Sequence, residues 1–379
     1  MALVIGKATP YDLLHGFVTI NDADGVTDGA DQIVGTDMSD HIYAGGGNDV
    51  VKGGGGADTI DGGAGHDGVS YEDSDAGVSV SLVTGKGHGG TAEGDTLISV
   101  EDLYGSKHDD KLVGDSGDNL LSGGDGNDTL KGGGGADTLK GGAGDDVMQI
   151  DGVGDHVYGG AGNDTVIMDS AQGFKIDLRS GFIDFNPFEN GISPHMKHQV
   201  ESGYGPGFFP HAPGDEPQLT DVENVIGSKF NDAIYGNDGN NNLSGGDGDD
   251  VLSGQGGDDI ISGGNGNDLI FGGAGADTLT GGTGSDTFVF SSAAASQMVN
   301  GKPMDLITDF ETNVDHIDLT AFNLQNGQFI ELDNQVIGGT NYSVIGVDAN
   351  GNHQLDEGEF AVAVKMAPGT ALHLQDFLF

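Results

Sequence analysis

Residues 227–289 consist of seven nine-residue units that follow one another without a gap. They read GSKFNDAIY, GNDGNNNLS, GGDGDDVLS, GQGGDDIIS, GGNGNDLIF, GGAGADTLT and GGTGSDTFV. Position 6 of every unit is Asp or Asn, and position 8 is always apolar. A chain that repeats every nine residues has to build each unit into the same small structure, so this stretch constrains the fold more than any other part of the sequence.

Each unit predicts a tight turn followed by a short strand. Positions 7 to 9 form the strand, whose middle side chain points inward and whose neighbours point outward, because side chains alternate along a strand. Glycine at positions 1, 2 and 4 supplies the positive-φ conformations and the close backbone approach that reversing the chain requires. Two units make one coil, so units i and i+2 stack about 4.8 Å apart. The predicted fold class is all-β, a parallel β-roll.

The stacking places the position-6 carboxylates of successive coils in columns of like charge. Like charges at such distances oppose folding, and no lysines interleave to relieve them. Ca²⁺ between successive coils would remove the repulsion, because it takes oxygen ligands from carboxylates and backbone carbonyls. We therefore expect Ca²⁺ as the cofactor, with binding energy that is also folding energy. The alternative is a disordered Gly- and Asp-rich segment, but disorder would not keep position 8 apolar at a strict spacing.

The repeat also occurs in two earlier stretches, which gives three predicted rolls. The first covers 26–70, the second 105–167 and the third 227–289. If each ion lies between units i and i+2, the rolls hold on the order of 13 calcium ions, and fewer where Asn or atypical first units weaken a site. The position-6 residues expected to bind calcium are Asp31, Asp40, Asp49, Asp58, Asp67, Asp110, Asn119, Asp128, Asp137, Asp146, Asp155, Asp164, Asp232, Asn241, Asp250, Asp259, Asp268, Asp277 and Asp286.

Three non-repetitive segments precede or separate the rolls. Residues 1–25 predict an N-terminal cap, since the terminal units of a solenoid need a different outer face. Residues 71–104 predict a hairpin insertion, because GVSVSLVTG alternates apolar and polar residues. Residues 168–226 contain the related GFKIDLRSG and are longer, with Pro, Phe and His in their extra part. An internal duplication of roll plus hairpin is the simplest account of this pattern.

Residues 185–217 of the third segment leave two functions open. His195 and His198 lie three residues apart on one face of a short predicted helix, with Glu201 and His211 nearby. They could bind a transition metal, or they could be exposed on an irregular loop packed against a roll. The aromatic residues around this segment could stack on sugars or pack on the roll instead. They are Phe182, Phe185, Phe188, Tyr204, Phe208 and Phe209.

The last segment, 290–379, contains a second type of candidate calcium site. DANGNHQLDEGE at 348–359 places oxygen-bearing side chains at positions 1, 3, 5, 9 and 12 of an EF-hand-like loop. Position 6 is His353 instead of glycine, which puts the sharp turn of such a loop in question, and the flanks read as strands. The alternative is a solvated acidic turn. The five residues are Asp348, Asn350, Asn352, Asp356 and Glu359.

The nonapeptide G-G-x-G-x-D-x-U-x is identified as the calcium-binding repeat of RTX (hemolysin-type) proteins. The strands DLITDF and DHIDLTAF, after the GSDTFVF exit from the third roll, resemble the C-terminal module of serralysin metalloproteases. In that family the module carries the type I secretion signal, and Asp376-Phe377-Leu378-Phe379 resembles the family's ending of an acid and three apolar residues. The roll-plus-hairpin pattern also resembles the R-modules of secreted mannuronan C-5 epimerases, which assist a catalytic module.

The composition favours a calcium-rich environment. The net charge is −48, from 61 acidic and 13 basic residues, so the chain repels nucleic acids and anionic membranes and attracts cations. The absence of cysteine excludes disulfides and thiolate metal sites. The N-terminus lacks the features of a Sec signal, and no apolar run approaches the ~20 residues of a transmembrane helix. We expect a secreted, extracellular protein that uses the type I secretion machinery of a Gram-negative bacterium.

No catalytic signature occurs in the sequence. It has no H-E-x-x-H motif, no G-x-S-x-G motif and no cysteine nucleophile. The sequence therefore predicts a non-catalytic protein that folds on Ca²⁺ after export and acts as a structural, matrix or adhesive protein, with self-association left open. One alternative is a polysaccharide-binding accessory module. Another is an enzyme with a metal site in the 185–217 segment.

Overall fold

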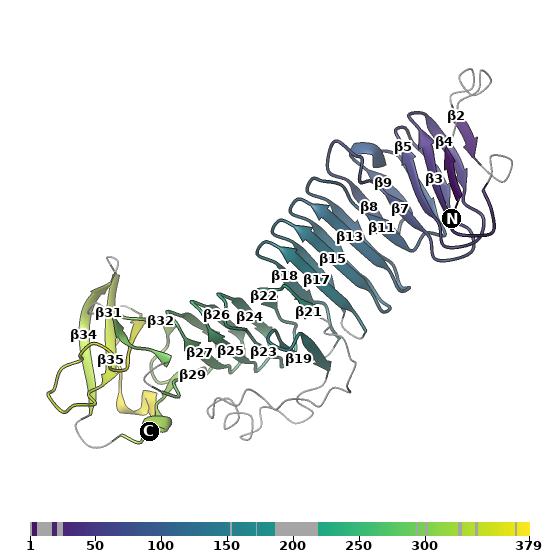
Figure 1. Cartoon of the computed structure of the whole chain (residues 1–379). Helices are drawn as coiled ribbons and strands as arrows, with labels where there is room; N and C mark the ends of the chain where they lie inside the picture. The colour runs from purple at the N-terminus through teal and green to yellow at the C-terminus, as the bar shows by residue number, and fades with distance from the viewer. Residues whose placement is uncertain are drawn as a thin grey trace. The chain divides into compact units, whose positions relative to one another are not determined.

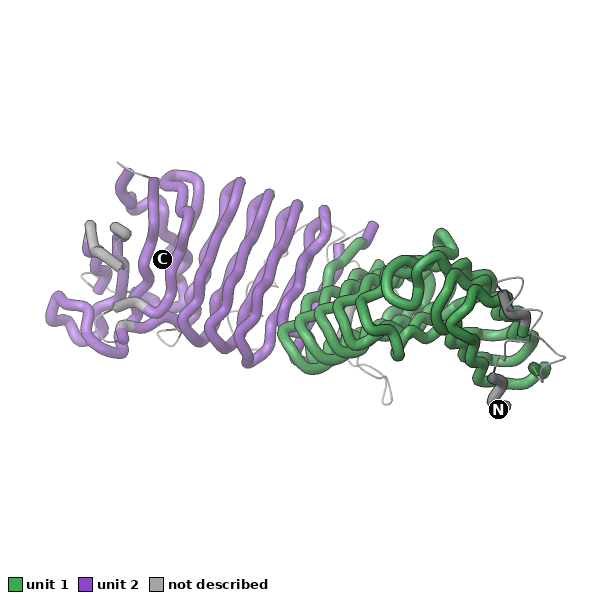
Figure 2. Tube along the Cα trace, turned by 90° about the horizontal axis from the view of Figure 1, so that it is seen from above, with its two compact units in different colours: residues 1–169, 218–222 green, residues 170–217, 223–379 purple. Residues whose placement is uncertain are grey.

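In the computed structural model, the described residues are 2–5, 17–20, 26–151, 154–171, 173–185, 219–292, 295–299, 302–324, 328–337, 340–367 and 370–379. They form strands, turns and three short 3-10 helices, and no α-helix occurs among them. None of the helices in these ranges is long and apolar enough to cross a membrane. The chain divides into two compact units, which Figure 2 colours green and purple.

The first unit, residues 1–169 with 218–222, is built from two rows of parallel strands. One row is a nine-stranded sheet, and the other row includes an antiparallel hairpin. In order, the nine-stranded sheet contains β1 (Ala2–Ile5), β3 (Asp31–Thr36), β5 (Val50–Gly54), β7 (Gly68–Ser70), β11 (Asp102–Tyr104), β13 (Leu120–Asp125), β15 (Thr138–Ala143), β17 (His156–Ala161) and β21 (Leu219–Thr220). The other row contains β2 (Phe17–Ile20), β4 (Ser39–Tyr43), β6 (Thr59–Asp61), β8 (Ser79–Ser81), β9 (Lys86–His88), β10 (Thr96–Ile98), β12 (Lys111–Val113), β14 (Thr129–Lys131), β16 (Val147–Ile150) and β18 (Thr165–Met168).

The register of the strands follows from the length of one coil. Strand β13 pairs with β15 so that Leu121 faces Leu139, 18 residues later, and β15 pairs with β17 so that Leu139 faces Val157. These position-8 side chains are fully buried. Because two nonapeptides make one coil, equivalent positions stack, and the interior becomes a continuous ladder of apolar side chains. The predicted parallel β-roll is confirmed (Figure 1).

The segment 71–104 leaves the coil on one side only. In one row, β8 and β9 form an antiparallel hairpin, β10 pairs in parallel with β6, and β8 pairs in parallel with β12. In the other row, β7 pairs directly with β11, and β11 pairs with β13. A short 3-10 helix, η2 (Gly90–Ala92), lies between β9 and β10. The parallel pairing therefore continues on both sides of the inserted hairpin.

The second unit, residues 170–217 with 223–379, repeats this architecture. The antiparallel hairpin of β19 (Phe174–Asp177) and β20 (Phe182–Phe185) begins it, and β19 pairs in parallel with a strand of the following roll, as β8 does with β12 in the first unit. One sheet contains, in order, β20 (Phe182–Phe185), β19 (Phe174–Asp177), β23 (Ala233–Tyr235), β25 (Val251–Gly256), β27 (Leu269–Ala274), β29 (Thr287–Val289), β33 (His316–Asp318) and β37 (Phe377–Leu378). The opposite row contains β22 (Asn224–Ile226), β24 (Asn242–Asp247), β26 (Ile260–Asn265), β28 (Thr278–Thr283) and β32 (Asp305–Phe310).

The outward side chains of strands β23 to β29 differ from the simple pattern. The repeat predicts outward neighbours on both sides of the position-8 residue, yet several of these outward residues are apolar and buried here. The cluster consists of Ala233, Tyr235, Val251, Leu269, Phe271 and Val289. This sheet therefore carries apolar side chains on both faces.

The C-terminal strands extend the roll of the second unit. Strand β32 pairs in parallel with β28 and also with β36 (Ala361–Met366). Antiparallel pairing then adds β35 (Thr340–Val347) and β34 (Phe329–Ile337). On the other sheet β33 pairs with β29 and with β37. The remaining elements are the strand pair β30 (Met298–Val299) and β31 (Lys302–Pro303) and the 3-10 helices η4 (Thr320–Phe322) and η5 (Leu374–Asp376).

Candidate metal centre

The position-6 side chains lie buried where each turn enters its strand, and none of the 19 predicted residues is more than 4% exposed. Within a column, Oδ1 of one residue accepts the backbone N–H of the residue 18 positions earlier. Asp250 donates to Asp268 at 2.9 Å, and Asp268 donates to Asp286 at 2.9 Å. Asp128 donates to Asp146 at 2.8 Å in the first unit. The predicted columns therefore exist, and these bonds fix their spacing.

In most turns the second carboxylate oxygen, Oδ2, has no hydrogen-bond donor within the described ranges. Position 2 of these turns has a positive φ, as at Gly246 (112°) and Gly264 (118°), and Gln255 (76°) adopts this conformation without being glycine. We call these the open turns. A buried oxygen without a donor is rare in native proteins and points to an ion or water at that place. The open turns end in Asp49, Asp58, Asp67, Asp128, Asp137, Asp146, Asp250, Asp259, Asp268, Asp277 and Asp286.

The position-1 glycine of several turns, open and capped alike, lies beside two oxygen atoms. A Cβ atom on Gly245 would lie 2.1 Å from Oδ2 of Asp250 and 2.5 Å from the carbonyl oxygen of Gly263 on the next coil. The same arrangement occurs at Gly254, with Oδ2 of Asp259 and the Gly272 carbonyl. Carboxylate and carbonyl oxygens thus converge beside these glycines. This donor set suits Ca²⁺, which prefers oxygen ligands in flexible geometry.

The first two turns of each roll satisfy their position-6 side chain internally. There the backbone N–H of position 2 donates to the position-6 oxygen, and Ser or Thr at position 2 adds its hydroxyl. We call these the capped turns. They pair Thr27 with Asp31, Thr36 with Asp40, Ser106 with Asp110, Asp115 with Asn119, Ser228 with Asp232, and Asn237 with Asn241. In these six residues the capping bonds use oxygen lone pairs that a cation would otherwise need.

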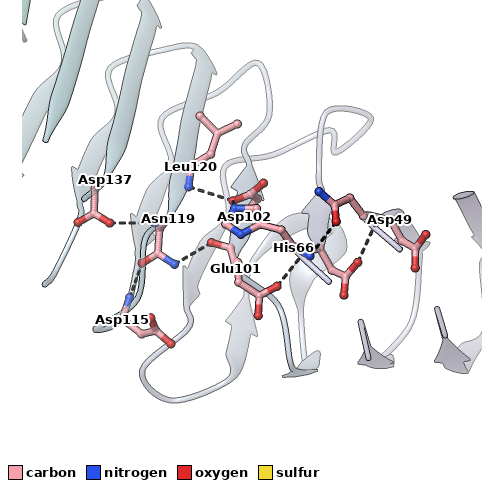
Figure 3. Close-up of polar contacts among 10 residues, drawn as sticks. Asp49, His66, Glu101, Asp102, Asp115, Asn119, Leu120 and Asp137 are labelled. Atoms are coloured by element: carbon pink, nitrogen blue, oxygen red, sulfur yellow. Dashed lines mark hydrogen bonds and ion pairs between the residues drawn. The ribbon is translucent and has the colours of Figure 1, made fainter. Parts of the chain in front are cut away.

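The two asparagines belong to capped turns for a physical reason. Oδ1 of Asn119 accepts the N–H of Asp115, and its Nδ2 donates to the carbonyl of Glu101 at 2.8 Å (Figure 3). Asn241 makes the same two contacts with Asn237 and with Glu223. An amide group therefore fits here better than a carboxylate, because the preceding coil presents an acceptor instead of a donor.

Burial makes the column carboxylates costly to ionise. It raises the pKa of Asp250 to about 9, and the neighbouring Asp268 and Asp232 add to the rise. Burial also raises the pKa of Asp128 and Asp259 to about 7. A bound cation has the opposite effect on a carboxylate, because it stabilises the ionised form. The columns are thus poised to take up either protons or cations.

The position-5 side chains form a second set of columns on the exposed side of the turns. In these columns acidic residues alternate with neutral ones. Asn127 donates its N–H to Asp109, Asp145 to Asn127, and Asn163 to Asp145. The second unit alternates in the same way along Asn231, Asp249, Asn267 and Ser285. No two acids are adjacent in these two ladders, whereas the buried columns carry an acid on nearly every rung. The contrast supports a counter-ion in the buried columns alone.

Sequence reasoning missed the acids that extend the columns beyond the nonapeptides. Asp95 accepts the N–H of Asp58 at 2.8 Å, and Glu101 accepts that of Asp67 at 2.8 Å. At the other end, Asp305 and Asp315 accept the N–H groups of Asp277 and Asp286. Each of these acids precedes a buried apolar residue by two positions, which is the spacing from position 6 to position 8. This acid-to-apolar spacing is visible in the sequence. The turns before these acids have irregular lengths, however, so a strict nine-residue repeat does not include them.

One acid beside the columns forms a contact of a different kind. Asp102, next to Glu101, accepts the N–H of Leu120 at 3.0 Å and lies 2.8 Å from Nε2 of His66 (Figure 3). His66 occupies position 5 of the last turn before the inserted hairpin. The contact therefore joins the turns on both sides of the insertion.

The EF-hand-like loop lies between β35 and β36. Oδ1 of Asp348 accepts the N–H of Gly351 at 2.6 Å, and Oδ2 accepts that of His353 at 2.7 Å. Glu359 accepts the N–H groups of Ala349 and Asp356. His353 has φ 61°, so the sharp turn at loop position 6 forms even without glycine. Oδ2 of Asp356 accepts the side-chain amides of Asn350 and Asn352, which gathers the five predicted residues around one loop.

Other predicted sites fall outside the described residues. They include His195, His198, Glu201 and His211, together with the aromatic residues of 186–217. Within the described part of the chain, no group of three or more His, Asp or Glu side chains could hold a metal ion. In the columns an ion between adjacent rungs would have two carboxylates available, and the other ligands would be backbone carbonyls.

The comparisons with known proteins concern the repeats. The family model of the RTX calcium-binding nonapeptide repeat matches residues 34–69, 102–121, 122–149, 154–167, 220–252 and 253–288. Two solved structures from Azotobacter vinelandii mannuronan C5-epimerase are similar at 28% identity over 41% of this chain. The AlgE6R3 subunit is covered over 81% of its length with a TM-score of 0.22, and the AlgE6R2 subunit over 92% with a TM-score of 0.24. No curated protein matches the chain.

The repeats and the fold define the class of the molecule. The matched segments carry RTX calcium-binding nonapeptide repeats, and they coil into the parallel β-rolls described above. The chain is a calcium-binding β-roll protein.

Proposed function

We propose that this protein is secreted by the type I route, folds when it meets extracellular Ca²⁺, and then acts as an extracellular structural, matrix or adhesive protein. The rolls predicted at 26–70, 105–167 and 227–289 are the calcium-loading parts, and the open turns hold most of the ions. The capped turns begin each roll, so the number of ions is smaller than the number of nonapeptides.

One observation carries the proposal: successive open turns bury carboxylate oxygens that have no hydrogen-bond donor among the described residues. Removing such charges from water costs several kcal/mol per ion unless a partner compensates. Lys52 of the first unit is engaged with Glu72 and Asp73 on the surface. Calcium supplies the compensation, and its binding free energy becomes folding free energy.

The C-terminal residues support folding after export. Asp376 is fully buried, with Oδ1 accepting the N–H of Asn313 at 2.8 Å and Oδ2 accepting that of His373 at 2.7 Å. Phe377 is also buried and packs against Phe329. In the folded chain Asp376 and Phe377 of the Asp376–Phe379 segment are therefore buried, whereas Phe379 is exposed. A secretion machinery that reads this segment needs an unfolded chain, which low cytosolic calcium provides.

Circular dichroism in EGTA, followed by addition of excess Ca²⁺, tests the proposal. The chelated chain at pH 8 is expected to lack strand structure, and calcium is expected to restore it cooperatively. Mg²⁺ is the matched control, because its small octahedral shell suits these carbonyl-rich turns poorly. Equal strand content with and without Ca²⁺ would contradict the proposal.

A polysaccharide-binding role is the second candidate, and a surface pocket of about 470 Å³ on the first unit favours it. Its lining includes Tyr104 together with Lys52, Glu72 and Asp73. An aromatic ring beside charged groups is a surface on which a sugar can stack and form hydrogen bonds. Binding on a glycan array that a Tyr104→Ala variant loses would favour this role, and no binding to any glycan would remove it.

A further inference from the structure

One buried column of the second unit does not end with the last nonapeptide. The N–H of Asn241 donates to Oδ1 of Asp259, and the N–H of Asp259 donates to Oδ1 of Asp277. In each of these pairs the two residues are 18 positions apart. Asp277 then donates to Oδ1 of Asp305 at 3.0 Å, although Asp305 lies 28 residues further along the chain. The backbone bond of the rung is also reproduced, because the N–H of Leu306 reaches the Asp277 carbonyl at 2.8 Å. Asp305 therefore occupies the next rung of this column.

Asp305 keeps the feature that distinguishes open turns. Its side chain is 1% exposed, and Oδ2 has no hydrogen-bond donor among the described residues. The hydroxyl of Ser296 lies beside this residue, but it accepts the N–H of Asp305 and donates to the carbonyl of Ala361. Oδ2 of Asp277, on the preceding rung, also lacks a donor. Two buried carboxylate oxygens without a donor among the described residues thus belong to adjacent rungs of one column.

Two other acids that extend the columns outside the repeats are different. Oδ2 of Asp95 accepts the hydroxyl of Tyr71 at 3.2 Å. Oδ2 of Asp315 accepts the N–H of Glu311 at 2.7 Å, which is the contact found in capped turns. Asp315 is buried like Asp305 and occupies the matching place in the opposite column. Asp315 is therefore bonded as in a capped turn, whereas Asp305 resembles the acid of an open turn.

We propose that Asp277 and Asp305 together bind a divalent cation, Ca²⁺, at a site outside the nonapeptide repeats. This inference rests on the proposed calcium columns and extends them to strand β32. Because β32 pairs with both β28 and β36, the ion fastens the C-terminal strands β34, β35 and β36 to the last coil of the roll. The C-terminal strands are then ordered by the same calcium uptake that closes the roll.

Counting bound calcium in the full chain tests the site. Native mass spectrometry of the folded protein at saturating Ca²⁺ is expected to find one ion fewer in an Asp305→Asn variant than in the wild type. The matched control is Asp315→Asn, which replaces an equally buried acid whose Oδ2 is already bonded, and it is expected to retain every ion. An unchanged count in Asp305→Asn, or an equal loss in both variants, would overturn the inference.

A second measurement uses only the wild-type protein, so it does not depend on whether a variant folds. In wild-type crystals grown with calcium, an anomalous scattering peak is expected between Oδ2 of Asp277 and Oδ2 of Asp305. Its absence beside peaks at the open turns would reject this site and leave the proposed function standing. Absence of calcium from the whole wild-type chain would instead reject the proposed function.

Discussion

A chelated chain is expected to lose its rolls at pH 8 and to regain strand structure as the pH falls to about 5. Burial raises the pKa of Asp250 to about 9 and the pKa of Asp58, Asp128 and Asp268 to about 7. A folded-state pKa above the ordinary 3.8 means that the native chain binds more protons than the unfolded chain. Stability from these groups is therefore full below pH 3.8 and is lost as the pH rises toward 7 to 9.

Circular dichroism of the EGTA-treated protein across this pH range measures the effect. With excess Ca²⁺ the pH dependence is expected to reverse, since cations displace protons and bind more tightly at higher pH. Asp250→Asn sharpens the test, because it removes the most costly charge and should stabilise the chelated chain at pH 8 while destabilising the calcium-loaded one. A chelated chain whose strand content is the same at pH 5 and pH 8 would refute this account of the columns.

Replacement of Gly264 by alanine is expected to destabilise the calcium-loaded protein by about 3 kcal/mol. Gly264 is the position-2 residue of an open turn, with φ 118°, a conformation that L side chains rarely adopt. A Cβ there would lie 2.0 Å from the carbonyl oxygen of Gly246 on the preceding coil, so the backbone itself would have to shift. Urea unfolding in saturating Ca²⁺, followed by circular dichroism, measures the loss.

Gly256→Ala is the matched control in the same unit. Gly256 is the position-3 residue of its turn and does not have a positive φ, and an added Cβ would meet only atoms at 3.7 Å or beyond. The free energy of unfolding of the Gly256→Ala variant is expected to differ from that of the wild type by no more than about 0.5 kcal/mol. Similar losses for the two variants would mean that the position-2 conformation does not hold the turn together.

The repeating part of the structure was predictable because two simple rules generate it. An apolar residue every nine positions specified the interior ladder, and the buried side chains of Leu121, Leu139 and Val157 confirm it. The acid two positions before each apolar residue specified the columns. Both rules are local, so they could be applied without knowing how distant segments meet.

The division between open and capped turns could not be predicted from position 6 alone, because the backbone conformation of position 2 decides it. Gln255 adopts φ 76° and leaves Asp259 open, although a sequence rule based on glycine would expect otherwise. The roles of Asp95 and Asp305 depend on inserted segments of irregular length that return to the column. Only the paired strands reveal that these acids continue it.

Anomalous scattering from a crystal of the calcium-loaded wild-type protein tests the central claim most directly. Peaks are expected between Oδ2 atoms of adjacent rungs at the open turns, such as Asp250 with Asp268 and Asp268 with Asp286. No peak of comparable height is expected beside the capped residues Asp31 and Asp232. Intact rolls in crystals grown with chelator at pH 8, or calcium confined to the outer surface, would contradict the claim that the ions close the coils.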